Sequence, residues 1–103
     1  MAMTVKTQIV GDNVHLSLNG RFDFTAHREF RQGYEQVLKQ AGLKGVALDL
    51  SGVDYIDSSA LGMLLLLKED AERGRMQLSL INCSGSVRRV LDIANFGKLF
   101  HLS

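Results

Sequence analysis

The stretch VALDLSGVDYIDSSALGMLLLL, residues 46–67, decides how the rest of the chain is interpreted. It begins with VALDL, a short and mostly apolar run that is typical of a strand covered on both faces. It ends with ALGMLLLL at residues 60–67, which is apolar nearly all round and turns polar at Lys68. We therefore expect a buried strand, a connecting segment over residues 51–56 and a helix whose first turns lie in the core.

The sequence before this stretch predicts a hairpin and then a helix. Residues 5–10 (VKTQIV) and 14–18 (VHLSL) flank Gly11-Asp12-Asn13, a tight-turn sequence. A loop is expected over residues 19–25, followed by a helix that Asp23 or Thr25 caps and Gly42 ends. Its apolar face comprises Ala26, Phe30, Tyr34, Val37, Leu38 and Ala41.

The sequence after this stretch predicts one more strand, one more helix and a short closing strand. These are residues 76–81, a helix begun by Ser84 or Ser86, and residues 98–102. The order strand–strand–helix–strand–helix–strand–helix–strand predicts an α/β fold, a mixed β-sheet with helices packed against it. A chain of 103 residues, 46% of them hydrophobic, fits a single domain spanning 1–103.

Composition argues against several classes of partner. Lys plus Arg is 12 and Asp plus Glu is 11, so no basic surface is expected for nucleic acid or an anionic membrane. The single cysteine, Cys83, forms no internal disulfide and suits a reducing compartment. The first six residues lack an apolar signal region, and the apolar run at 63–67 is far shorter than the ~20 residues of a membrane helix. We expect a cytoplasmic protein.

No pattern in the sequence predicts catalysis, a metal site or a cofactor. Ser58 lacks the flanking glycines of a nucleophile elbow, and there is no glycine-rich phosphate loop. Asp49, Asp54 and Asp57 supply too few oxygen ligands at too wide a spacing for a calcium loop. The histidines His15, His27 and His101 are expected to be solvated.

The segment Asp57-Ser58-Ser59 has two interpretations that the residues alone leave open. One is helix capping, because the first N–H groups of a buried helix need acceptors. The other is phosphorylation of Ser58, because the positive end of a helix dipole favours an anion there. A phosphate would add about 1.5–2 negative charges to the surface without opposing the fold.

At this segment the chain resembles STAS domains, specifically bacterial anti-sigma factor antagonists. Four stretches carry the resemblance in the family's order: GRFD at 20–23, VALDLS at 46–51, YIDSSALG at 55–62 and SGSVRRVLD at 84–92. Ala60 stands where glycine is commoner and Gly85 where proline is frequent. The chain stops soon after its last predicted strand, so the fourth, terminal helix of many relatives is expected to be absent.

The resemblance implies a partner-switching cycle in which the chain is a substrate and has no catalysis of its own. The unphosphorylated form binds an anti-sigma factor that is also a serine kinase and so releases sigma. The kinase then phosphorylates Ser58, which ends binding, and a PPM-type serine phosphatase reverses the step. Gly62 would let its helix pack closely. A monomer or weak homodimer is expected, and the implied partner contacts are Asp23, Phe24, Thr25, Asp57, Ser59, Ala60 and Met63.

Three alternatives remain at this point. One is a STAS subunit of a lipid-transport ABC complex, which the intact serine motif argues against. Another is a partner-switch regulator whose target is not a sigma factor, which the sequence does not separate from the first interpretation. A hydrolase using Ser58 would need a base that the sequence does not identify.

Overall fold

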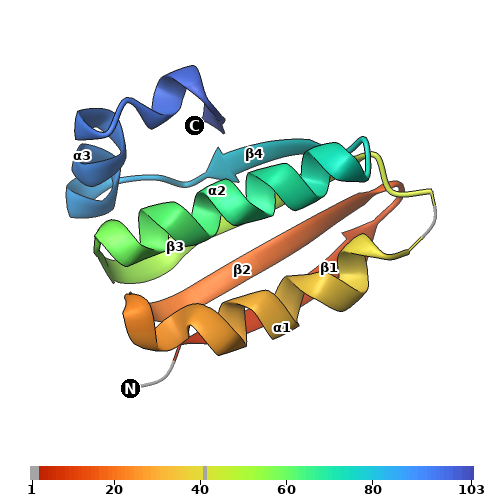
Figure 1. Cartoon of the computed structure of the whole chain (residues 1–103), viewed down its shortest axis with the longest axis horizontal. Coiled ribbons are helices and arrows are strands. Elements are labelled where there is room, and N and C mark those ends of the chain that lie inside the picture. The colour runs from red at the N-terminus through yellow and green to blue at the C-terminus, as the bar shows by residue number, and fades with distance from the viewer. Residues whose placement is uncertain (1–2, 41) are drawn as a thin grey trace.

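The computed structural model describes residues 3–40 and 42–103, which form a five-stranded sheet and three α-helices (Figure 1). The strands, in both chain and spatial order, are β1 (Thr4–Val10), β2 (Asn13–Phe22), β3 (Gly45–Ile56), β4 (Gln77–Ile81) and β5 (His101–Leu102). The helices are α1 (His27–Leu38), α2 (Ser58–Arg73) and α3 (Gly85–Ile93), with 3₁₀ turns η1 (Phe24–Ala26) and η2 (Phe96–Lys98). None of the helices in these ranges is both long and apolar enough to cross a bilayer.

The sheet is mixed, as the sequence predicts. β1 and β2 form the expected antiparallel hairpin, in which Val10 pairs with Asn13 across a two-residue turn. Gly11 has a φ of +63°, which a II′ hairpin turn requires at its first central position. All other neighbouring strands are parallel, so each is reached by a crossover that contains a helix.

The core lies between the sheet and the helices α1 and α2, which cover the same face of the sheet (Figure 1). Leu16, Leu48 and Leu80 lie side by side on three neighbouring strands, and each is 0% exposed. Residues at the alternate positions, such as His15 and Asp49, point away from this core and are partly exposed. A single hydrophobic cluster thus holds the strands in the register that positions their carboxyl ends.

The middle of the sheet extends further than the sequence predicts. Residues 19–22 and 51–56, expected as a loop and a connecting segment, continue β2 and β3 as a parallel pair with two register shifts. A Cβ on Gly52 would lie 2.6 Å from the carbonyl oxygen of Leu18, so glycine permits this close approach of the strands. The glycines and polar residues in these two segments, which suggest a loop in the sequence, therefore lie in an irregular part of the strand pairing.

Several helix and strand ends also differ from the prediction. Asp23 caps η1, whereas α1 begins at His27 without a side-chain cap. α1 ends at Leu38, before the predicted stop at Gly42, and the prediction for Ala41 lies outside the described residues. Residues 96–98 form η2, so the closing strand is limited to His101–Leu102.

Candidate functional site

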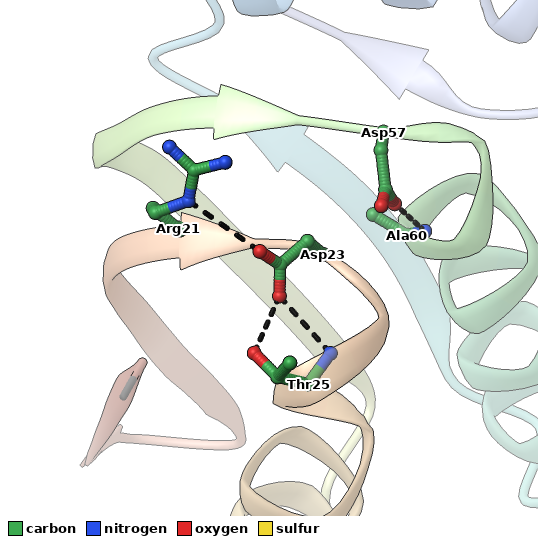
Figure 2. A network of polar contacts seen from close by, with 5 residues as sticks. All are labelled: Arg21, Asp23, Thr25, Asp57 and Ala60. Atoms are coloured by element: carbon green, nitrogen blue, oxygen red, sulfur yellow. Dashed lines mark hydrogen bonds and ion pairs between the residues drawn. The ribbon is translucent and has the colours of Figure 1, made fainter. Parts of the chain in front are cut away.

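The candidate site lies where β2 and β3 end. Because these strands are parallel, their carboxyl ends meet at the same end of the sheet, where Phe22 pairs with Ile56. The Asp57 N–H donates a hydrogen bond to the carbonyl oxygen of Phe22 at 3.3 Å. The two turns that follow these strands, one carrying Asp23 and the other Asp57, therefore lie side by side (Figure 2).

Asp57 is the N-cap of α2, as expected for one member of the predicted capping cluster. Its backbone is extended, and its carboxylate accepts a hydrogen bond from the Ala60 N–H at 3.0 Å (Figure 2). Ser58 is the first residue of this 16-residue helix and is exposed, as is Ser59. The positive end of the helix dipole therefore lies next to an accessible hydroxyl.

Asp23 is held by three hydrogen bonds (Figure 2). One carboxylate oxygen accepts from the Thr25 N–H at 3.0 Å and from the Thr25 hydroxyl at 2.6 Å. The other accepts from Arg21 Nε at 3.4 Å. The bond from the Thr25 hydroxyl, supported by the other two, lowers the pKa of Asp23, so its carboxylate is ionised at neutral pH.

Arg21 and Tyr55 form a pair that the sequence interpretation missed. They are register partners in β2 and β3, and the Arg21 guanidinium lies 4.1 Å from the centroid of the Tyr55 ring. Tyr55 is 42% exposed, so the pair forms part of the surface beside Asp23. The pair depends on the register of two strand ends, which the sequence predicts as a loop and a connecting segment.

The structure separates the predicted contact residues into accessible and buried sets. Phe24 is 71% exposed, Thr25 and Ser59 are exposed, and Asp23 and Asp57 are half-buried. Ala60 and Met63 are 0% and 5% exposed, because they lie on the side of α2 that packs on the core. These two side chains therefore stabilise the helix against the sheet, and a contact of either residue with a partner stays a prediction.

Gly62 also differs from expectation. The resemblance implies that this glycine lets the helix pack closely, but Gly62 is exposed, and a Cβ added there would meet no atom of residues 3–40 or 42–103 within 4 Å. A helix glycine that does permit close packing is Gly33 of α1, where a Cβ would lie 2.7 Å from the Cβ of Val5.

Two observations on the titratable residues bear on the environment of Ser58. Across residues 3–40 and 42–103, no three His, Cys, Asp or Glu side chains are grouped as metal ligands. The His15 side chain, expected to be solvated, is 37% exposed, and its Nε2 lies 3.0 Å from Asp49 Oδ2. Since His15 pairs with Ala47, nine residues before Ile56, it is roughly 30 Å along the strand from Ser58.

Comparison with known proteins identifies the family. A family model described as "Mlab, STAS domain" matches residues 5–102. The chain belongs to the STAS-domain family. A STAS-domain containing protein of Pseudomonas aeruginosa (strain UCBPP-PA14) is 45% identical over 103 residues, which cover 100% of both chains.

Solved STAS structures share the fold. An anti-sigma factor antagonist from Mycobacterium paratuberculosis aligns with a TM-score of 0.85 and 19% identity, over 97% of this chain and 84% of that one. A putative antagonist from Thermotoga maritima gives 0.84 and 24%, over 95% and 84%. The unphosphorylated antagonist SpoIIAA gives 0.79 and 20%, over 97% and 88%, and the set of similar structures also includes a phosphorylated SpoIIAA from Bacillus.

Proposed function

We propose that this STAS domain is an anti-sigma factor antagonist switched by phosphorylation of Ser58. The observation that carries the proposal is the position of Ser58: an exposed hydroxyl at the first residue of a capped helix, beside the turn of the ionised Asp23. The similarity of fold to SpoIIAA, whose structure exists in both forms, supports it. The unphosphorylated chain would bind a cytoplasmic anti-sigma factor and so release sigma.

The physical basis of the switch is a change of surface charge that leaves the fold intact. A phosphate at a helix N-terminus is stabilised by the dipole, so the domain stays folded. It adds about 1.5–2 negative charges next to Asp23 and Asp57, and a partner that fits the neutral hydroxyl would have to desolvate them. A penalty of about 3 kcal/mol weakens binding by two powers of ten.

In the proposed cycle, the partners carry out both catalytic steps. The anti-sigma factor is itself the serine kinase that transfers the γ-phosphoryl group of ATP to the Ser58 oxygen, releasing ADP and the hydroxyl proton. A PPM-type serine phosphatase hydrolyses that ester and restores the binding form. Ser58 thus accepts the group, and Asp57 and Asp23 shape the surface around it.

The test compares variants with a neutral and a negatively charged side chain at residue 58. We expect Ser58→Ala to bind the purified anti-sigma kinase as tightly as the unphosphorylated wild type, and Ser58→Glu to bind at least about 100-fold more weakly. Calorimetric titration measures both affinities, with far-UV circular dichroism to check the fold. Equal affinity for wild type, Ser58→Ala and Ser58→Glu would reject the switch.

Ser59→Ala is the matched control, because Ser59 is the neighbouring exposed serine of the same helix turn. It should still accept one phosphate when incubated with the kinase and ATP, and mass spectrometry of peptides should place that phosphate on residue 58. Phosphate found only on residue 59 in the wild type would refute the assignment. A transporter ATPase as the only partner, bound alike by Ser58→Ala and Ser58→Glu, would favour the transport alternative.

A further inference from the structure

The outer side of α2 carries a strip of four residues, Ser58, Gly62, Leu65 and Leu66, which we call the outer strip. Residues three and four apart on a helix are neighbours on its surface, so Gly62 lies one turn from Ser58 and the two leucines lie one turn further. Leu65 and Leu66 are 39% and 44% exposed. Gly62, which has no side chain, therefore lies between Ser58 and the apolar patch that Leu65 and Leu66 form.

A glycine at residue 62 lowers the stability of the helix, and no contact in the described part of the chain requires it. Glycine inside a helix is less stable than alanine because it loses more backbone freedom on folding. Gly62 has no positive φ that would exclude other residues, and the space above it is open. Gly33, by contrast, is required by the packing of α1 on Val5.

We propose that Gly62 is the point at which a backbone segment of the anti-sigma partner crosses α2 in van der Waals contact, with Leu65 and Leu66 receiving its apolar side chains. This inference rests on the proposed function, because the partner is the one that Ser58 controls. A Cβ at residue 62 would stand between the two backbones and hold them apart.

The charge pattern of α2 defines the chemistry of the crossing segment. No charged residue occurs from Ser58 to Leu67, and charges begin at Lys68. Asp57 precedes this stretch and Lys68 and Glu69 follow it, so a counter-charge is available only at its ends. At Gly62 a charged side chain brought by the partner would be buried without a counter-charge at a large cost, so the segment that crosses there is neutral and apolar. Close contact one turn from Ser58 also excludes the water that would otherwise screen a phosphate there.

The test measures stability and affinity on the same variants. Gly62→Ala should raise the melting temperature by about 4–6 °C, since alanine favours the helix. It should also weaken binding of the purified anti-sigma kinase at least about tenfold. Gly62→Leu, also a good helix former, should stay at least as stable as wild type and bind more weakly than Gly62→Ala.

Gly33→Ala is the matched control, because it makes the same substitution in the other helix. Its Cβ would clash with Val5, so its melting temperature should fall while its affinity, measured where it is folded, equals that of wild type. Gly62→Ala binding as tightly as wild type, or melting below it, would overturn the crossing.

The same assay separates this inference from the proposed function. If Ser58→Glu loses binding and Gly62→Ala does not, the switch stands and the crossing at Gly62 is wrong. If Ser58→Glu binds like wild type, the phosphorylation switch fails, and the two Gly62 variants still decide whether the partner crosses the helix there.

Discussion

At the residue scale, the carboxylate of Asp57 fixes where α2 begins. Asp57→Ala should lower the free energy of unfolding by about 1 kcal/mol, because the Ala60 N–H loses its side-chain acceptor. Urea unfolding followed by circular dichroism measures the loss. Asp57→Asn keeps an acceptor oxygen and should retain most of the stability; an equal loss in both variants would mean that charge, not the hydrogen bond, supports the helix start.

Asp49 should make stability depend on pH below 4. Partial burial opposes ionisation, but hydrogen bonds from Ser51, Asn82 and His15 lower the pKa of Asp49 to about 2. Its side chain is 14% exposed. The folded carboxylate therefore stabilises the protein fully above the ordinary pKa near 3.8, and this contribution is lost as the pH falls from there through about 2.

Asp49→Asn should therefore be less stable than wild type by about 1–2 kcal/mol at pH 5, with the difference shrinking as the pH falls from 4 to 2. Urea unfolding of both proteins over that pH range gives the difference directly. A gap that stays constant down to pH 2 would mean that the contribution of Asp49 does not depend on its charge.

Residue types predicted the helix cap at Asp57 but not which way α2 faces. Capping is local, so Asp57 and its two serines identify a helix start without knowledge of the rest of the chain. The segment 60–67 is apolar nearly all round, so no polar face shows which side meets the sheet. The structure shows that Ala60 and Met63 lie on the side that packs on the core and that Gly62 faces outward, an orientation that this pattern does not predict.

At the element scale, a single side-chain bond links α1 to α2. The Tyr34 hydroxyl donates to Asp70 at 3.0 Å, and burial together with this bond raises the pKa of Tyr34. Tyr34→Phe should lower the free energy of unfolding by about 1 kcal/mol, measured by urea unfolding. Asp70→Asn, which keeps an acceptor for the hydroxyl, is the control and should lose less; no change in Tyr34→Phe would show that the bond adds nothing net.

Elements that are defined by a local sequence pattern were predicted correctly. The strand extensions, which depend on pairing with a segment distant in the sequence, were not. The hairpin around Gly11 and the helices follow from turn residues and helical spacing within short windows. The extension of β2 and β3 does not, because residues such as Gly20 and Gly52 resemble turn residues until the partner strand is known. The Arg21–Tyr55 pair depends on that same distant register.

At the scale of the whole molecule, one core supports all five strands, so unfolding should be a single transition. Leu48→Ala removes a side chain that is 0% exposed from the centre of the sheet and should cost about 2–5 kcal/mol. Tyrosine fluorescence and far-UV circular dichroism should shift together to the same lower urea midpoint. Separate midpoints for the two probes would indicate that part of the sheet unfolds alone.

The bare helix surface at Gly62 also has a consequence for how sequences of this domain respond to selection. A library randomised at residue 62 and sorted only for folded protein should enrich alanine and other helix formers. The same library sorted for growth that depends on the partner should return glycine. A disagreement between the two sorted populations at residue 62 would identify this position as part of the surface that the partner covers, without a structure of the complex.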